Sequence, residues 1–339
     1  MAEPRTVEQE VADMNTALPP QKLEALLVED VAQLVLAPPA KASVFLTVTV
    51  NPGKESEAVE ALGDVPGLKR GVGFRVPEND LSCVVGIGSD AWDRMYTGAR
   101  PDQLHPFPVI GSGSRVAVAT PGDLLFHIRA TRFDMCFSLA QHLLERFGDA
   151  VTPVDETHGF RSWDERDLLG FVDGTENPER FEAVASAFIP QGPWRGGSYV
   201  VTQKYLHDLD KWNATSVEEQ ENVIGRSKLS DIEQPDGVQR SNSHVGANQL
   251  FAEDGSQLQI VRDNLPFGNA SAKEFGTYFI GYANDPRVTE HMLEQMFIGK
   301  PEGNYDLILD FSTAVTGNLY FVPPADFLEN PEEFTTPAS

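Results

Sequence analysis

Residues 170–178, GFVDGTENP, are the densest group of side chains in the sequence that could do chemistry. Gly170 and Gly174 allow a tight backbone that a large ligand can approach closely. They also leave the carboxylate of Asp173 directed into the space that the turn lines. The pair DG followed by NP is more often an ordinary turn. Residue types alone therefore leave two interpretations open, a carboxylate site and a plain turn.

One of the seven histidines, His244, lies in an unusual setting, SNSHVGAN. Its small neighbours, Ser243 and Gly246, would let a bulky planar group come close to the imidazole, which is a common metal ligand. The others lie in contexts typical of packing or surface residues: His105, His127, His142, His158, His207 and His291. Composition alone does not decide whether His244 is a ligand or another ordinary histidine.

Polar residues interrupt two apolar stretches further along the chain. In QLQIVRDNLPFG, Arg262 and Asn264 are two residues apart on a strand-like segment, so we expect them on the same face. They need polar partners or a pocket that uses them, and pairing of Arg262 with one of the many acids is the alternative. Asp310 lies in LILDFSTAVTGNLYFVPP, where a carboxylate is costly unless it meets a donor such as the free N–H of a ligating histidine.

Composition excludes several classes of protein. The 339 residues carry 51 Asp and Glu against 26 Lys and Arg, a net charge of -25, which repels nucleic acids and anionic lipid surfaces. Two cysteines without metal-ligand spacing exclude a thiolate metal cage and a disulfide scaffold, and we expect both to be buried. The N-terminus has no apolar signal region and the apolar runs are too short to span a bilayer, so we expect no membrane association and a cytoplasmic protein.

The elements that must position these residues occur in two similar series. Residues 1–40 are expected to form a peripheral arm, with helical spacing over residues 21–36. Residues 41–150 predict a strand, a helix, two further strands and the amphipathic helix 132–147, and residues 151–190 predict a loop-rich linker carrying the aspartate motif. Residues 191–324 return to strands and helices, and residues 325–339 form an acidic tail. We expect an α+β fold with two similar halves that face each other and have antiparallel sheets.

Four segments in this order, GFVDGTENP, SHVGAN, IVRDNLPFG and DFSTAVTGNLYFVP, resemble the dye-decolorizing peroxidases. The resemblance extends from about Ala42 to about Pro324 and is greatest for the bacterial B-type, or P-type, branch. It implies two ferredoxin-like halves of the dimeric α+β barrel superfamily. One haem b per chain would lie between the sheet and the helices of the C-terminal half.

The same resemblance implies roles for individual residues. His244 would be the proximal iron ligand, and Asp173, Arg262 and Asn264 would be the distal catalytic residues. Asp310 is the expected acceptor of the imidazole N–H, with Asp306 as the alternative. The glycine Gly174 would border the cofactor. Arg226, in VIGRSKLSD, would neutralise a haem propionate unless it is a helix-end cation.

The implied activity is reduction of hydrogen peroxide at the expense of dyes, phenols or other small one-electron donors. A haem carrier or an iron-releasing haem protein of the same fold is the alternative, and a chlorite-decomposing enzyme is disfavoured by the aspartate motif. Relatives suggest a homo-oligomer. The C-terminal PEEFTTPAS does not resemble a docking tail for a protein shell, so encapsulation is not predicted.

Overall fold

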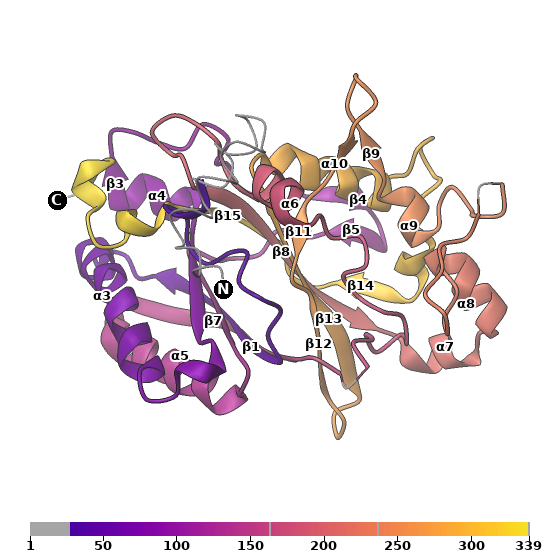
Figure 1. Ribbon diagram of the computed structural model, residues 1–339, viewed down its shortest axis with the longest axis horizontal. Coiled ribbons are helices and arrows are strands. Elements are labelled where there is room, and N and C mark those ends of the chain that lie inside the picture. The colour runs from indigo at the N-terminus through magenta and orange to yellow at the C-terminus, as the bar shows by residue number, and fades with distance from the viewer. Residues whose placement is uncertain (1–27, 163, 236, 338–339) are drawn as a thin grey trace, which may run out of the picture.

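The computed structural model describes residues 28–337 with the exception of 163 and 236. Its strands form one ten-stranded sheet and three two-stranded ones within these residues. Figure 1 shows the helices of the N-terminal half, α3 to α5, on one side of the molecule and α7 to α9 of the C-terminal half on the other.

The N-terminal half contributes four antiparallel strands in the order β2-β6-β1-β7. Strand β1 is rich in β-branched residues and is buried almost throughout, because alternate side chains enter two different cores. The outward core lies under α3 and α5. The bounds of these elements are β1 (Ala42–Val50), β2 (Ser82–Gly88), β6 (Leu124–Ala130), β7 (Val151–Phe160), α3 (Glu55–Gly73), α4 (Ser89–Met95) and α5 (Phe133–Phe147).

The C-terminal half is built around two long antiparallel strands, β8 (Ser198–His207) and β13 (Glu274–Ala283). The other strands of this part of the sheet are β11 (Val261–Arg262), β12 (Leu265–Asn269), β14 (Ser312–Ala314) and β15 (Asn318–Val322). Its helices are α6 (Arg180–Ala187), α7 (Leu209–Ala214), α8 (Val217–Ile224), α9 (His244–Ala247) and α10 (Pro286–Phe297). The short strands elsewhere are β3 (Tyr96–Thr97), β4 (Ile110–Ser112), β5 (Arg115–Ala117), β9 (Leu250–Phe251), β10 (Gln257–Leu258) and β16 (Thr336–Pro337).

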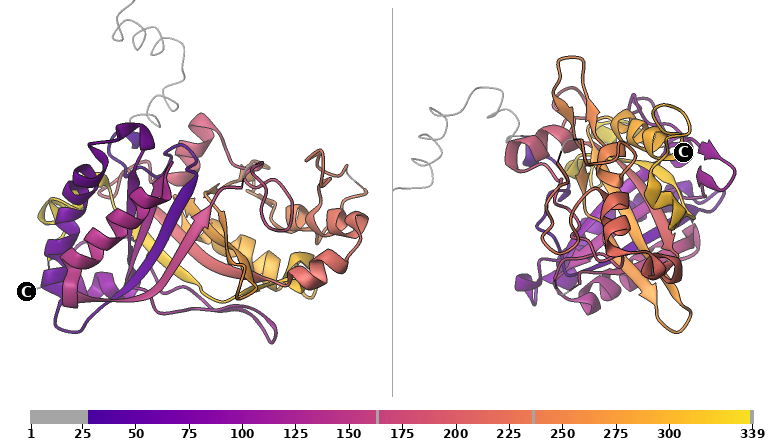
Figure 2. Two further views of the ribbon diagram at one scale, coloured as in Figure 1. Left: turned by 90° about the horizontal axis from the view of Figure 1, so that it is seen from below. Right: turned by 90° about the vertical axis from the view of Figure 1, so that its right-hand side faces the viewer.

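The two halves are joined edge to edge and also face each other. Strand β15 pairs with β2, which makes the two sets of strands one sheet. The sheet then curves so that the inner faces meet, and the ring of Phe45 from β1 stacks on Tyr278 from β13 with 4.0 Å between centroids. Figure 2 shows the strands in the middle with helices on both outer sides. The expected α+β fold with two facing antiparallel halves is confirmed.

Three segments differ from the sequence-based expectation. The start of the supposed linker is strand β7, which pairs along the whole of β1. Because β7 is the last strand in the order of the sheet, many of its residues are exposed and polar, and the sequence there does not show the pattern of a buried strand. The segment QLQIVRDNLPF forms three short strands, β10 to β12, in place of one. His207, expected at the surface, is buried at the end of β8.

Both terminal segments pack more closely than an arm and a tail would. The first 27 residues of the expected arm lie outside the described residues, but Val28 and Val35 are buried in the core between the halves. The amide of Gln33 bonds to the backbone of Val85 and Pro323. At the other end, Phe327 is fully buried among the aromatic rings near α4.

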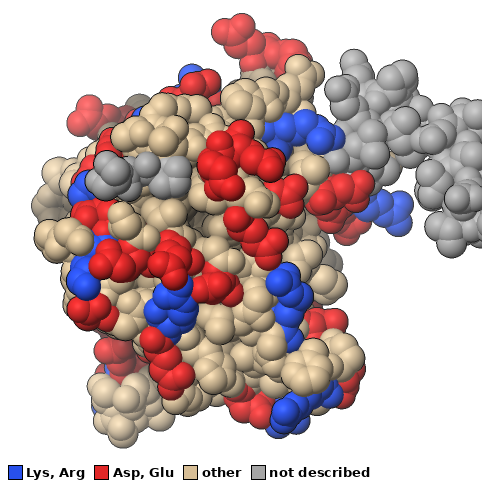
Figure 3. Space-filling view, turned by 90° about the vertical axis from the view of Figure 1, so that its left-hand side faces the viewer, with Lys and Arg blue, Asp and Glu red and all other residues tan. Residues whose placement is uncertain are grey.

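Charged side chains are spread over the surface. Figure 3 shows acidic side chains across the face of the N-terminal half, with basic ones set among them. Both cysteines, Cys83 and Cys136, are free and buried as expected, and burial raises the pKa of each thiol to about 12. Among the described residues, none of the helices has the length and apolarity that crossing a bilayer requires.

Candidate active site

A large pocket lies in the C-terminal half, between the outer face of the sheet and the helices α8, α9 and α10. It contains about 1440 Å³ of empty space, including the part that opens to solvent. Strands β8, β11 and β13 form one wall, and most of the helical wall is apolar. The apolar lining includes Ile224, Val245, Ile260, Phe279, Leu293 and Met296.

His244 enters the pocket from the helical side. It is the first residue of the short helix α9, whose start is fixed by Ser243, because the Ser243 hydroxyl accepts a hydrogen bond from Gly246 N–H. The imidazole Nδ1 lies 2.7 Å from a carboxylate oxygen of Asp306. Asn248 donates hydrogen bonds to the His244 carbonyl and to the same Asp306 oxygen. The ring orientation is therefore fixed chiefly by Asp306, which lies behind the pocket wall.

Asp306 is held as firmly as the ring that it orients. Its side chain is fully buried, and its second oxygen accepts a hydrogen bond of 3.0 Å from Ile308 N–H. The Asp306 N–H donates to the carbonyl of Met296 in α10. One carboxylate oxygen is therefore paired with the backbone, and the other accepts the hydrogen bonds from His244 Nδ1 and the Asn248 amide.

The prediction that Asp310 accepts the imidazole N–H of His244 is wrong. The alternative, Asp306, is the residue that forms this hydrogen bond. Asp310 instead accepts a hydrogen bond of 2.6 Å from the guanidinium of Arg115 and contacts the hydroxyl of Tyr305. The two acids are at opposite ends of one 3-10 turn, residues 306–310, and only the buried one faces His244. The apolar sequence around Asp310 suggested burial, whereas Arg115 from β5 supplies its counter-charge near the surface.

The electrostatics of His244 favour a basic imidazole. Burial lowers the pKa of His244, but the charge and hydrogen bond of Asp306 outweigh this effect, so the net pKa is raised. Within the described residues, the ring's hydrogen bonds fall on Nδ1, which leaves Nε2 as the nitrogen able to bind a metal.

Asp173 reaches the pocket from a compact loop before α6. The loop is a small hairpin in which Asp173 N–H bonds to the carbonyl of Glu165, and Gly174 follows with a φ of +88°, a conformation that favours glycine. The Asp173 carboxylate lies 3.5 Å from the amide nitrogen of Asn264. The Asn264 oxygen accepts from Ile280 N–H in β13, which fixes the direction of the amide. Asp173, Gly174 and Asn264 all line the pocket, as expected.

Arg262 lies in the sheet wall at the end of β11. Its buried Nε atom has no hydrogen-bond partner among the described residues, although Asp173 and Glu176 act on it electrostatically. Burial lowers the pKa of Arg262 and raises that of Asp173, and each charge offsets part of this effect on the other. A half-buried guanidinium that lines the pocket is suited to hold an anionic or polar oxygen.

Asn177 is a residue whose part in the site was not predicted. Its side-chain oxygen accepts from the N–H of Arg262 at 2.9 Å, and its amide nitrogen donates to the Arg262 carbonyl at 2.7 Å. Asn177 thus joins the loop of Asp173 to the strand of Arg262. It belongs to the GFVDGTENP motif, where an asparagine before proline suggests only a turn.

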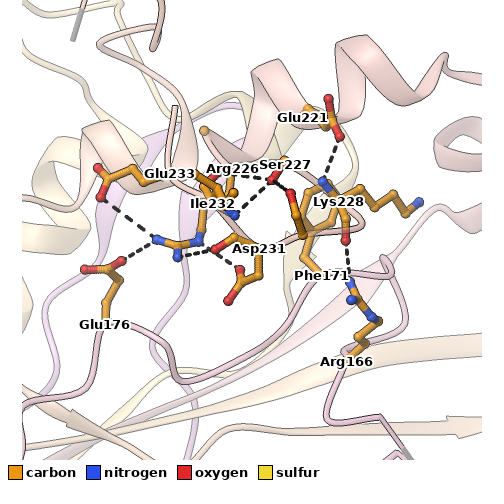
Figure 4. A network of polar contacts seen from close by, with 12 residues as sticks. Arg166, Phe171, Glu176, Glu221, Arg226, Ser227, Lys228, Asp231, Ile232 and Glu233 are labelled. Carbon is orange, nitrogen blue, oxygen red and sulfur yellow. Dashed lines mark hydrogen bonds and ion pairs between the residues drawn. The ribbon is translucent and has the colours of Figure 1, made fainter. Parts of the chain in front are cut away.

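Arg226 borders the pocket but already has acidic partners. Figure 4 shows its guanidinium between Glu176 and Asp231, at 2.6 Å and 2.9 Å, with Glu233 at 4.0 Å. The side chain is largely buried, so this is neither a surface helix-end cation nor an unpaired charge. A propionate, the partner expected for Arg226, would have to displace these carboxylates or bind the guanidinium together with them.

The pocket fits a flat apolar cofactor that needs one protein ligand. Across the described residues, no group of three or more His, Cys, Asp and Glu side chains could hold a metal ion. A metal at Nε2 of His244 would therefore have to bring its own equatorial ligands, as haem iron does. Apolar walls, a histidine with a carboxylate partner and a polar group from the sheet side together match such a cofactor.

Comparison with known proteins identifies the family. The family models described as Dyp-type peroxidase, N-terminal, and Dyp-type peroxidase, C-terminal, match residues 32–161 and 164–327. A dye-decolorizing peroxidase of Brevibacterium linens is 57% identical over 302 residues, 88% of this chain and 82% of that protein. The encapsulated DyP-type peroxidase from Mycobacterium smegmatis has a TM-score of 0.87 at 55% identity, covering 89% of this chain and 98% of that one. A variant of DypB from Rhodococcus jostii RHA1 in complex with heme has a TM-score of 0.86 at 51% identity, covering 88% and 97%. The chain belongs to the Dyp-type peroxidase family.

Proposed function

We propose that this protein is a haem-dependent peroxidase that reduces hydrogen peroxide and oxidises dyes, phenols or other one-electron donors. The observation that carries the proposal is the arrangement around one pocket. His244, with its buried carboxylate partner, comes from the helical side, and Arg262 and Asn264 come from the sheet side next to Asp173. One haem b per chain is the cofactor.

His244 would hold the cofactor through Nε2. When bound, haem supplies the redox centre at which the O–O bond of peroxide is broken. The hydrogen bond from Nδ1–H to Asp306 makes the imidazole a stronger electron donor, which favours the oxidised forms of the metal.

Asp173 is the residue placed to accept a proton from hydrogen peroxide. Its carboxylate is half-buried at the pocket wall, and the loss of solvent raises its pKa above that of a free aspartic acid, which makes it a stronger base. Arg262 and His244 oppose this rise, so the carboxylate keeps its charge more easily than burial alone would allow. The Asn264 amide, which donates toward Asp173, fixes the orientation of the acceptor oxygen.

Arg262 contributes a fixed positive charge beside the same carboxylate. Breaking the O–O bond places negative charge on the departing oxygen, and a buried guanidinium donor stabilises that charge without having to reorganise. The side chain lines the pocket, so its charge acts on the atoms that react there. By analogy with oxyanion-hole donors, this contribution is about 3 kcal/mol, or roughly a hundredfold in rate.

The decisive experiment combines haem binding with peroxide kinetics. We expect the protein purified with sufficient haem to show a Soret band, to react rapidly with hydrogen peroxide in stopped-flow measurements, and to oxidise a phenolic or azo dye. Arg262→Leu should keep its haem and react with peroxide about a hundredfold more slowly. Haem binding without a rapid reaction with peroxide would favour a haem carrier and contradict the peroxidase proposal.

A second experiment tests the ligand. His244→Ala should lose or severely weaken haem binding, whereas His291→Ala should not, because His291 is exposed on α10 and pairs with Glu294. Equal haem affinity in the two variants would remove His244 from the proposed role.

A further inference from the structure

Asp263 lies between the two distal residues that the sheet provides, and its side chain points the opposite way. Successive side chains of a strand alternate between the two faces of the sheet, and Arg262 and Asn264 both line the pocket. Asp263 is therefore directed to the other face, toward the N-terminal half. There its carboxylate accepts a hydrogen bond of 2.9 Å from the guanidinium of Arg129 in β6. The segment that carries two distal residues is thus held from behind by a residue of the other half.

The ion pair of Arg129 and Asp263 is buried between the two halves. The exposed fraction of the side chain is 2% for Arg129 and 11% for Asp263, so solvent screens the pair weakly. The guanidinium also donates to the carbonyls of Leu34 and Val35. His127 lies 3.8 Å from the carboxylate, but burial and the charge of Arg129 hold the pKa of its imidazole well below the usual value. Arg129 is therefore the cation that compensates Asp263, and it joins three separate parts of the chain.

The main chain at Asp263 depends on side-chain contacts because the ladder of the sheet is interrupted there. Strand β11 ends at Arg262 and β12 begins at Leu265, although both pair with β13 in the same register. Asp263 N–H still donates to the carbonyl of Ile280 at 3.2 Å, but Ile280 N–H donates to the side-chain oxygen of Asn264. A side-chain bond thus replaces a backbone bond at the point where the distal side chains leave the strand.

We propose that Asp263 and Arg129 are positioning residues of the distal site. Their hydrogen bond fixes the segment between β11 and β12, and so it sets where the Arg262 guanidinium and the Asn264 amide lie in the pocket. The N-terminal half then takes part in the reaction with peroxide through this ion pair. The inference deepens the proposed peroxidase function and rests on it for its catalytic meaning.

The direction of the contact explains why it matters in addition to that of Asn177. Asn177 bonds to the backbone of Arg262 and acts in the plane of the sheet, as ladder hydrogen bonds do. The side chain of Asp263 stands roughly perpendicular to that plane. Loss of its bond to Arg129 therefore lets the segment move toward or away from the pocket, which is the direction in which the Arg262 guanidinium approaches a bound ligand.

Two variants that remove the same charge separate the hydrogen bond from the ion pair. Asp263→Asn is neutral, but its amide oxygen can still accept from Arg129, whereas Asp263→Ala offers no acceptor. Both leave a buried guanidinium without its counter-charge, so both should unfold at a lower denaturant concentration than the wild type. Asp263→Ala should react with hydrogen peroxide about ten- to a hundredfold more slowly, because the distal residues are misplaced. Asp263→Asn, the matched control, should stay close to the wild-type rate.

The infrared C–O stretch of carbon monoxide bound to the reduced haem protein reports the distal charge without turnover. A positive group near the oxygen of carbon monoxide lowers this frequency, so the band should move to higher frequency in Asp263→Ala and keep its place in Asp263→Asn. The measurement needs haem but no reaction with peroxide. A protein that shows these band positions and no rapid reaction with peroxide would contradict the proposed function alone.

Asp263→Ala combined with Arg129→Met keeps the test decisive if the single alanine variant fails to fold. The double variant leaves no unpaired buried charge, so its stability should return toward that of the wild type. The slow reaction and the shifted band should remain, which a merely structural role does not explain. A wild-type rate and band in this variant or in folded Asp263→Ala would overturn the proposal. Equal losses in Asp263→Asn and Asp263→Ala would do the same, because the hydrogen bond would then not place the segment.

Discussion

The side-chain amide of Asn177 forms two hydrogen bonds with the backbone of Arg262, because it accepts one from the N–H and donates one to the carbonyl. This contact reproduces the pairing that a neighbouring strand would give at the free edge of β11. It ties the loop of Asp173 to the sheet, so the distance between the acid and the guanidinium is set by a bidentate contact and not by the loop alone.

Replacement of Asn177 by alanine should therefore impair the reaction with hydrogen peroxide and leave haem binding intact. Removal of both hydrogen bonds frees the loop by a fraction of an ångström or more, and misplacement of this kind costs about ten- to a hundredfold in rate. Stopped-flow measurement of the second-order rate constant checks this. Asn213→Ala, at an exposed position in α7, is the control and should react at the wild-type rate.

The pair of acids on the 3-10 turn 306–310 allows a matched test of the proximal site. Asp306→Asn removes the charge that makes His244 basic, so haem affinity should fall about ten- to a hundredfold and the haem reduction potential should rise. Asp310→Asn should change neither quantity, because Asp310 contacts Arg115 and Tyr305. Haem titration and spectroelectrochemistry measure both effects. Equal losses in the two variants would mean that the turn, and not the contact with His244, matters.

The fold class and several residues that line the pocket could be predicted from the sequence, whereas the contacts between individual side chains could not. Small neighbours or a polar break in an apolar stretch drew attention to Asp173, His244, Arg262 and Asn264, and the resemblance to the dye-decolorizing peroxidases implied that they share one site; all four line the pocket. The choice between Asp306 and Asp310 could not be predicted, because it depends on which end of one turn faces α9. It also depends on Arg115, which comes from a strand far away in the sequence. The homo-oligomeric state, the absence of a shell-docking tail and the contact of Arg226 with a propionate stay predictions.

His207 predicts how stability responds to acid. Burial lowers its pKa to about 4, and its nitrogens bond to Ser312 and Thr277. The unfolded chain, in which a histidine has a pKa of about 6.5, binds the proton first as pH falls. The stability present above pH 6.5 is therefore lost as pH falls toward 4, by about 2 kcal/mol between about pH 7 and pH 5.

Denaturant unfolding of His207→Gln at these two pH values measures the effect. The glutamine can keep hydrogen bonds to Ser312 and Thr277 but does not titrate, so its free energy of unfolding should fall about 2 kcal/mol less on acidification than that of the wild type. Other titrating groups act alike in both proteins and cancel in the difference. His142→Gln, at an exposed site in α5, should behave as the wild type does.

The net charge of -25 predicts which electron donors the protein prefers. The acidic side chains spread over the surface attract cationic donors and repel anionic ones, so that the encounter rates differ even when the donors are equally easy to oxidise (Figure 3). The preference should weaken as salt is raised, because the screening length shortens from about 30 Å at 0.01 M to about 8 Å at 0.15 M. Steady-state oxidation of a cationic and an anionic dye of matched potential, each measured at these two ionic strengths, checks this. A ratio of the two rates that does not change with salt would place the selection of donors in short-range contacts and not in the surface charge.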